Sequence, residues 1–273
     1  MHPVLFRLGS IPVNTYGLAL AISFLLGMKL GSRRAARIGI SPGQISNLAV
    51  SVMVAAIVGS RLFYVLTHLD EFAGSWLDAV AFWKGLYGLS MLGGVILAMI
   101  TGFGYIIWKR WPVWKLVDAV IPAFALGIFI TRIGCFFNGC CFGSETHSCL
   151  GVSFPAGSMP WNVFGDTPIH PAQLYSAAAG LFLLLVLLIA DRRKSYPGFI
   201  FCLFMGLYGI TRFGLEEFRY FDHNPDLLLG YSHFAGRPGI TDNQLISLVV
   251  LIAALVIGSW LYFRHSRISA ASS

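Results

Sequence analysis

Long apolar stretches separated by short polar segments make up most of the chain. A helix needs about 20 apolar residues to cross the hydrocarbon core of a bilayer, which is roughly 30 Å thick. Seven stretches are long enough, and they cover approximately residues 15–31, 45–67, 86–108, 116–136, 171–190, 198–218 and 243–263. The pattern predicts an all-α polytopic membrane protein of about seven transmembrane helices, with residues 1–273 forming a single transmembrane domain.

The composition supports a protein that is solvated by lipid. Charged residues make up 11% of the chain and hydrophobic residues 56%, whereas a soluble domain carries about 25% charged residues to wet its surface. The net charge of +7 does not indicate a nucleic-acid partner, because most basic residues lie in the loops between spans. The first 14 residues lack the features of a cleavable signal peptide, so we expect the first apolar stretch to remain as a span.

Basic residues are distributed unevenly between the two alternating sets of loops. Cytoplasmic loops of membrane proteins are enriched in lysine and arginine. One set carries four basic residues, Arg7, Lys84, Arg219 and Arg237. The other carries twelve: Lys29, Arg33, Arg34, Arg37, Lys109, Arg110, Lys115, Arg192, Arg193, Lys194, Arg264 and Arg267. The asymmetry predicts an N-terminus outside and a C-terminus in the cytoplasm, with the long segments 137–170 and 219–242 as outward-facing cap loops.

Three arginines lie inside the predicted spans: Arg61, Arg132 and Arg212. An arginine near the bilayer centre costs at least about 2.5–3.5 kcal/mol, so it normally has a partner. All three occur in the second half of spans that run outward from the cytoplasm, so we expect them in the outer half of the membrane. Because a guanidinium binds phosphate through two parallel hydrogen bonds, this placement favours an anionic lipid headgroup as the ligand.

Internal ion pairing is the alternative explanation. Glu216 follows Arg212 by four positions and therefore lies on its helical face. Asp118 is a second acidic candidate inside a span. One facing glutamate leaves three arginines incompletely matched, which favours an external anion. Other polar residues at span ends are candidates to line the same site: Tyr16, Tyr208, His170, Gln173 and Tyr175.

Four of the five cysteines are close together in the sequence: Cys135, Cys140, Cys141 and Cys149. Thiolates suit zinc or an iron–sulfur centre, but no C-x2-C pair is present and the adjacent Cys140 and Cys141 are not expected to point at one ion. We therefore expect no metal and no cofactor. A disulfide is chemically permitted in an outward loop, and simple packing is the remaining possibility.

The run from Arg132 to Gly143, RIGCFFNGCCFG, resembles the signature of prolipoprotein diacylglyceryl transferases in a cysteine-bearing form, GRIGCFxNGCCxG. Further stretches resemble the family in order along nearly the whole chain. They are HPVLFRLGSIPVNTYGL, VGSRLFYV with Arg61, HPAQLY, YGITRFGLEEFR and GITDNQLISL. The resemblance implies a multi-pass enzyme of the bacterial inner membrane whose active site faces the outer leaflet.

The resemblance also implies an activity and a set of site residues. The family transfers a diacylglyceryl group from phosphatidylglycerol to the lipobox cysteine of a prolipoprotein signal peptide, forming a thioether and releasing glycerol phosphate. At matching positions, Arg132 and Arg212 would bind the lipid phosphate. The other motif positions that would line the site are Tyr16, Asn138, Gly143, Tyr208, Glu216 and Arg219.

The chain departs from the family pattern in the third span. Residues 90–94 read SMLGG, so Leu92 stands where the family has a histidine or tyrosine, and leucine cannot transfer a proton. We therefore expect Tyr208, His170 or Glu216 to remove the proton of the substrate thiol.

Further departures lie in the signature itself, and they leave a second hypothesis open. Thr131 replaces a glycine, and Cys135 and Cys140 replace an asparagine and a glutamate. The competing hypothesis is a relative that binds phospholipid or signal peptide without transfer. A secondary transporter is a weaker possibility, because no inverted repeat is seen in the sequence.

Overall fold

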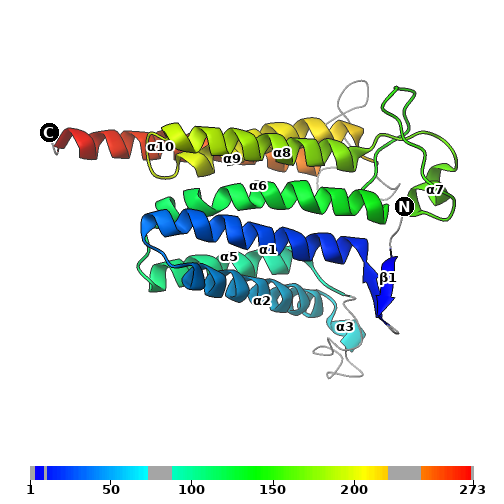
Figure 1. Cartoon of the computed structure of the whole chain (residues 1–273), viewed down its shortest axis with the longest axis horizontal. Helices are drawn as coiled ribbons and strands as arrows, with labels where there is room; N and C mark the ends of the chain where they lie inside the picture. Colours follow the sequence, from blue (N-terminus) through cyan, green and yellow to red (C-terminus); the bar gives the residue numbers. More distant parts are fainter. Residues whose placement is uncertain (1–3, 9–10, 73–87, 221–240, 272–273) are drawn as a thin grey trace. The chain divides into compact units, whose positions relative to one another are not determined.

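The computed structural model describes residues 4–8, 11–72, 88–220 and 241–271, and these residues include seven helices long and apolar enough to cross a membrane (Figure 1). The seven are α1 (Thr15–Ala35), α2 (Pro42–Thr67), α5 (Met91–Trp108), α6 (Val113–Asn138), α8 (Ala172–Ala190), α9 (Phe199–Leu215) and α10 (Asp242–Ala271). The predicted all-α polytopic architecture is confirmed. The sidedness of the termini and the single domain stay predictions.

Short elements accompany the long helices. They are β1 (Val4–Leu8), β2 (Ile11–Asn14), α3 (Leu69–Phe72), α7 (Met159–Phe164) and single 3-10 turns at Ala36–Ile38, Asp191–Arg193 and Glu216–Phe218. The antiparallel pair β1–β2, with Leu8 opposite Ile11, was not predicted. Its signal in the sequence is a Gly-Ser dipeptide between two short apolar runs.

The third long helix begins later than the sequence predicted. We expected a span from residue 86, but α5 starts at Met91. Gly88 has φ +70°, a conformation that an α-helix cannot contain. Ser90 is extended, and its N–H donates to the Ser60 carbonyl at 2.9 Å. Residues 88–90 therefore precede the helix, and Ser90 is held against α2.

Helix starts follow the local sequence closely. Ser41-Pro42-Gly43-Gln44 forms a capping box in which the Ser41 hydroxyl accepts from the Gln44 N–H and the Gln44 side chain accepts from the Ser41 N–H. Proline at the first position of α2 costs no hydrogen bond, because that N–H has no partner in the helix.

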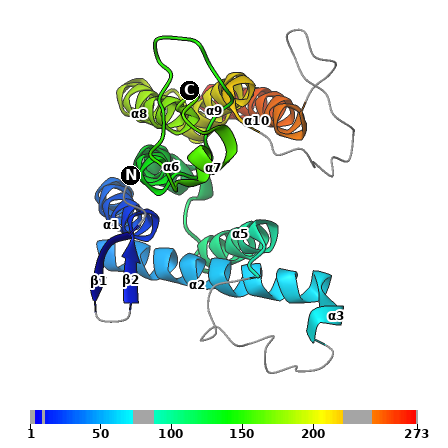
Figure 2. The ribbon, with the colours of Figure 1, turned by 90° about the vertical axis from the view of Figure 1, so that its right-hand side faces the viewer.

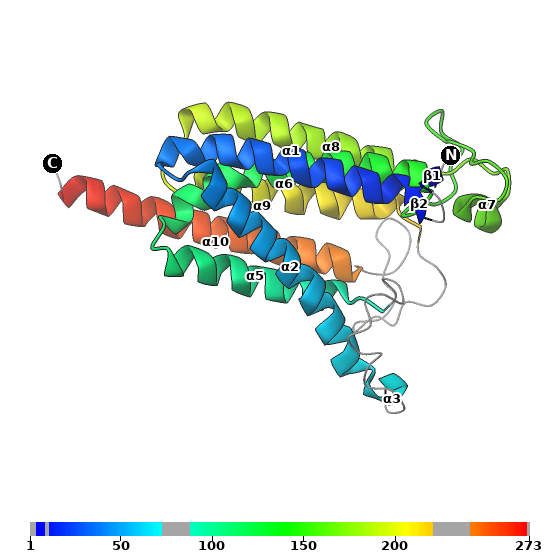
Figure 3. The same cartoon turned by 60° about the horizontal axis from the view of Figure 1, so that its bottom comes forward.

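The chain divides into two compact units: a first unit of residues 1–31 and 117–273, and a second unit of residues 32–116. In the second unit α2 crosses α5 (Figure 3). Glycines allow the two backbones to touch: a Cβ added at Gly93 would lie 2.1 Å from the Phe63 Cβ and 2.4 Å from the Gly59 carbonyl oxygen. Small residues serve this purpose in membrane helix pairs.

The Gly93→Ala substitution is expected to force α2 and α5 apart and to lower the free energy of unfolding by about 1–3 kcal/mol, the usual cost of overpacking. Thermal unfolding in detergent, followed by tryptophan fluorescence, measures the effect. Gly104→Ala in the same helix is the matched control, because a Cβ there meets nothing within 4 Å. Equal unfolding temperatures for the two variants would show that the close approach does not stabilise this unit.

The first unit has α8, α9 and α10 in a row with α6 beside them, as the end-on view in Figure 2 shows. Its buried core joins α6, α8 and α9 through Ile121, Ala125, Leu183, Leu184, Leu187, Ile200 and Phe204. Helix α1 packs against α6 at Gly134, where an added Cβ would lie 2.4 Å from the Ala19 Cβ.

Asp118 fixes one end of this unit. Its fully buried carboxylate accepts the N–H groups of Gly198 (2.8 Å) and Phe201 (3.0 Å) at the start of α9, where the helix dipole favours negative charge. The start of α6 therefore meets the start of α9, next to the basic turn 191–193. The loop after α6 lies at the opposite end of the unit (Figure 1).

Candidate active site

Three chain segments meet at the end of the first unit that is opposite Asp118. They are the loop that follows α6, the start of α8 and the end of α9. The Gly143 N–H donates to the His170 carbonyl (3.0 Å), and the His170 N–H donates to the Ser144 carbonyl (2.9 Å). The Ser144 N–H donates to the Phe218 carbonyl (3.1 Å). These backbone bonds place the candidate residues of all three segments in one region.

Gly143 lies at the centre of this junction. A Cβ added there would lie 2.4 Å from the carbonyl oxygens of both His170 and Phe218. Contacts below about 3 Å do not occur between real atoms of these kinds, so only glycine allows the three backbones to approach this closely. The close packing of these three backbones therefore explains why position 143, a predicted site residue, is a glycine.

The Gly143→Ala substitution is expected to open the junction and to lower the free energy of unfolding by about 1–3 kcal/mol. Limited proteolysis should also cut the loop of residues 139–171 faster, because its hydrogen bonds to α8 and α9 are weakened. The control is Gly214→Ala in α9, where an added Cβ meets nothing within 4 Å. Unchanged cleavage of the Gly143 variant would contradict the role of this contact.

The loop after α6 has its own small core. Phe142, Phe154 and Ile169 are buried, and the Tyr220 ring stacks on Phe142 with centroids 5.5 Å apart. Helix α7 lies in the same loop and begins at the Ser158 cap. The predicted cap loop 137–170 is thus a packed element. Most of the second predicted loop, 219–242, lies outside the described residues.

The first two cysteines of the signature meet because α6 ends in a Schellman motif. The Cys140 N–H donates to the Cys135 carbonyl (3.2 Å), and the N–H of Gly139, at φ +78°, donates to the Phe136 carbonyl (3.2 Å). In a Schellman motif the side chain three residues before the helix cap contacts the side chain two residues after it. Asn138 is the cap of α6, so these two side chains are Cys135 and Cys140.

The third cysteine joins them through an unusual backbone conformation. Cys141 has φ +59°, which is uncommon for a residue with a side chain. The sulfurs of Cys135, Cys140 and Cys141 all lie within 4.8 Å of one another. The expectation that adjacent cysteines could not point to one position is therefore wrong. All five cysteines lie in the described residues, and none forms a disulfide.

Arg132 lies one helical turn before Cys135 on α6, on the same face. It is partly buried, and it forms no hydrogen bond or ion pair with any residue that the structure describes. Tyr16, from the first turn of α1, is within electrostatic range of Arg132 and of all three thiols. The sequence prediction of Arg132 and Tyr16 in one site is consistent with this arrangement.

The electrostatic surroundings favour a thiolate at Cys141. Hydrogen bonds from the Cys135 and Cys140 thiols lower the pKa of the Cys141 thiol, and the guanidiniums of Arg132 and Arg219 act in the same direction. Asn138, the last residue of α6, places its amide beside Cys140. Arg219 pairs in an isolated β-bridge with Gly143, which explains its position near the cysteines.

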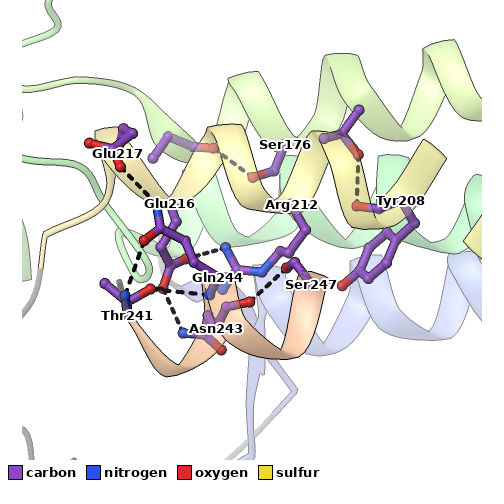
Figure 4. A network of polar contacts seen from close by, with 11 residues as sticks. Ser176, Tyr208, Arg212, Glu216, Glu217, Thr241, Asn243, Gln244 and Ser247 are labelled. Atoms are coloured by element: carbon purple, nitrogen blue, oxygen red, sulfur yellow. Dashed lines mark hydrogen bonds and ion pairs between the residues drawn. The ribbon is translucent and has the colours of Figure 1, made fainter. Parts of the chain in front are cut away.

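Arg212 on α9 has a carboxylate partner (Figure 4). Its guanidinium pairs with Glu216, whose side chain is buried. Glu216 also accepts from the Asn243 amide (2.6 Å) and the Thr241 hydroxyl (3.4 Å) at the start of α10. Internal pairing, the alternative weighed from the sequence, is thus confirmed for Arg212. Within the described residues only one guanidinium nitrogen of Arg212 is engaged.

Asn243 and Thr241 were not among the predicted site residues. They belong to GITDNQLISL, where several polar side chains directly precede an apolar span. That pattern was the available signal. In the same turn the Gln244 amide donates to Glu217 at 2.7 Å, so both glutamates at the end of α9 bind the start of α10 (Figure 4).

Tyr208 lies one turn before Arg212, and Figure 4 shows both side chains on the same side of α9. The Tyr208 ring stacks on Phe204 with centroids 5.7 Å apart and packs against the core of the unit. These contacts fix the Tyr208 ring on the side of α9 that carries Arg212.

The start of α8 carries the other predicted polar residues. The His170 Nδ1 is 3.2 Å from the Tyr175 hydroxyl, and partial burial lowers the pKa of His170, so the ring is neutral at pH 7. Gln173 is fully buried, and its amide nitrogen donates to the Cys140 carbonyl at 2.9 Å. The Gln173 carbonyl oxygen has no hydrogen-bond partner in the described part of the chain.

Arg61 is the one predicted site residue that belongs to the second unit. There its Nη1 donates to the Gly88 carbonyl at 3.1 Å, and its guanidinium lies 5.4 Å from the centroid of the Phe72 ring. These contacts join Arg61 of α2 to Gly88, just before α5, and to Phe72 of α3. The remaining predicted residues all belong to the first unit.

Comparison with known proteins agrees with the resemblance found in the motifs. The family model described as prolipoprotein diacylglyceryl transferase matches residues 3–260. A protein of Solidesulfovibrio magneticus named phosphatidylglycerol–prolipoprotein diacylglyceryl transferase is 35% identical over 97% of this chain and 94% of its own length. Proteins of the same name are 32% identical in Thermosynechococcus vestitus, covering 94% of this chain and 90% of theirs, and 30% identical in Prochlorococcus marinus, covering 94% and 89%. The chain therefore belongs to the prolipoprotein diacylglyceryl transferase family.

Proposed function

We propose that this protein transfers the diacylglyceryl group of phosphatidylglycerol to the lipobox cysteine of prolipoprotein signal peptides. One structural observation supports the proposal most strongly. Arg132, at the end of a membrane-spanning helix, has no ion pair with any described residue and lies beside a group of thiols. An unpaired guanidinium in this setting is expected to bind an anion.

The phosphate of the lipid headgroup is the anion that fits. Arg132 would bind it through the two-pronged geometry that guanidinium and phosphate share. Arg212 would contribute through the nitrogens that Glu216 does not use. Because Glu216 is itself held by Asn243 and Thr241, the Arg212 side chain would meet the phosphate in a fixed orientation. Ordered donors of this kind need no reorganisation during the reaction.

The reaction exchanges one carbon–oxygen bond for one carbon–sulfur bond. The substrate thiol loses its proton, its sulfur attacks the glyceryl carbon that carries the phosphate ester, and the carbon–oxygen bond breaks. The electron pair stays on the phosphate oxygen, and glycerol phosphate leaves. The arginines would stabilise the charge that grows on this phosphate.

His170 is the best of the three predicted proton acceptors, His170, Glu216 and Tyr208. The Glu216 carboxylate already accepts hydrogen bonds from Arg212, Asn243 and Thr241, so its oxygens are engaged within the protein. His170 is neutral at pH 7 because burial lowers its pKa, so it can accept a proton. Tyr208 would then orient the lipid rather than act as the base.

We place the reaction at the outer leaflet of the bacterial inner membrane. The junction of Gly143, His170 and Phe218 lies at the end of the first unit that is opposite the basic turn 191–193. Basic turns mark the cytoplasmic side. The proposed site would therefore face the compartment into which signal peptides emerge.

Purified protein reconstituted with phosphatidylglycerol labelled in the glyceryl carbons of its diacylglyceryl group tests the proposal. A peptide with a lipobox cysteine should acquire the label through a bond that resists mild alkali and thiols, as a thioether does. The same peptide with serine at that position, and phosphatidylethanolamine as donor, are the controls. Binding of the peptide without transfer of label would instead support a relative that holds these ligands and performs no chemistry.

A further inference from the structure

The three sulfurs at the end of α6 have the spacing of a metal site. Those of Cys135, Cys140 and Cys141 all lie within 4.8 Å of one another. Zinc–sulfur bonds are about 2.3 Å long, so sulfurs bound tetrahedrally to one zinc ion are roughly 3.8 Å apart. The sulfurs are therefore at most about 1 Å farther apart than a bound zinc ion requires.

The backbone holds these ligands in place before any ion binds. Cys135 and Cys140 are brought together by the Schellman motif, and Cys141 turns toward them only because its φ is +59°. The buried Gln173 amide fixes the carbonyl between the last two cysteines at 2.9 Å. A strained residue that persists at one place often serves a ligand, and here the strain brings the third sulfur into the group.

Charge and ligand type select the ion. Three thiolates and one divalent ion carry a net charge of −1, and Arg132 and Arg219 lie within electrostatic range of Cys141 to balance it. Soft thiolate ligands select zinc or monovalent copper among the biological metals. Three protein ligands leave the fourth position of tetrahedral zinc open, which is typical of a catalytic zinc site.

We propose that Cys135, Cys140 and Cys141 bind one zinc ion and that the fourth position takes the thiol of the peptide substrate. The identity of this fourth ligand rests on the proposed function. A thiol that coordinates a metal is deprotonated, so the ion would prepare the nucleophile that the transfer needs.

The transfer then balances without any further reactant. The substrate thiol releases its proton to His170, the acceptor of the proposed function, as its sulfur binds zinc. The zinc-bound sulfur attacks the glyceryl carbon, the bond from that carbon to the phosphate oxygen breaks, and the oxygen keeps the electron pair. The thioether product is a weak ligand and leaves the ion. The zinc ion is neither oxidised nor reduced, and the transfer needs no oxidant or reductant.

Metal analysis of the protein, purified in detergent under non-oxidising conditions and loaded with zinc, tests the site. We expect one zinc ion per chain. Serine at position 135, 140 or 141 should weaken zinc binding by more than about 100-fold, because changes outside the ligand shell already cost 10–100-fold. Cys149→Ser and Cys202→Ser are the matched controls and should bind as the parent does. Equal zinc content in all five variants, or a disulfide within the group, would overturn the proposal.

Cobalt in place of zinc tests the open position on the unaltered chain. Thiolate-bound cobalt has visible bands that report its ligands. A lipobox-cysteine peptide should change these bands in the absence of phosphatidylglycerol, and the serine peptide should not. If the bands change but no label is transferred in the assay above, the zinc site stands and the proposed function fails. If metal-free protein transfers label at the full rate, the zinc proposal fails and the function stands.

Discussion

Replacing Arg132 by lysine is expected to lower kcat/KM for phosphatidylglycerol by about 100-fold or more, the usual effect of removing one preorganised donor to a developing anion. Lysine keeps the positive charge but loses the planar pair of N–H groups that a phosphate receives from arginine. Arg132 has no hydrogen bond or ion pair with the described residues. The substitution therefore removes an interaction with substrate and breaks none within the fold.

The measurement is the label-transfer assay with phosphatidylglycerol at several concentrations. Arg267→Lys is the matched control, because Arg267 is an exposed arginine near the C-terminal end of α10. Its rate should equal that of the parent. The unfolding temperature of both variants should stay unchanged. Full activity of the Arg132 variant would show that the phosphate is bound elsewhere or as a point charge only.

The fold was largely predictable because its cause lies in the composition of each segment. Apolar stretches of the length of a bilayer have few alternatives to a helix, and the seven spans follow from that constraint. The exceptions are local. The start of α5 differs because Gly88 takes a positive φ. The β1–β2 hairpin depends on pairing between two apolar runs that are too short to show a clear period.

The sequence predicted the arginines of the candidate site better than it predicted the residues that contact them. The position of Glu216 four residues after Arg212 indicated their pairing, because helical geometry fixes which residues share a face. The contact between Glu216 and Asn243 joins residues 27 positions apart, and helical periodicity cannot predict it.

The contact among Cys135, Cys140 and Cys141 likewise could not be predicted from helical periodicity, although these residues are close in the sequence. Its convergence depends on the C-terminal cap of α6 and on one left-handed residue, Cys141. Gly139 in the signature indicated such a cap. The absence of a C-x2-C pair argued against a metal site, but that spacing is typical of loops other than the end of a helix.

The Glu216→Gln substitution is expected to lower the free energy of unfolding by about 3 kcal/mol, because it leaves the Arg212 charge without its buried partner. For a protein of this size each kcal/mol corresponds to roughly 2–4 °C, so the unfolding temperature should fall by about 6–12 °C. Glutamine keeps the size of the side chain, which separates the loss of charge from a loss of packing. The ends of α9 and α10 would separate first, because Glu216 joins them through Asn243 and Thr241.

Glu217→Gln is the matched control for this variant. Glu217 is the next residue, is exposed and contacts Gln244 of α10, but it is not paired with Arg212. Its substitution should change the unfolding temperature by little. The double variant Glu216→Gln/Asn243→Asp exchanges the amide and the carboxylate at their point of contact, so a partly buried carboxylate again lies near Arg212. We expect it to recover part of the lost stability. Equal losses at positions 216 and 217, or no recovery in the double variant, would show that the buried ion pair does not hold these two helices together.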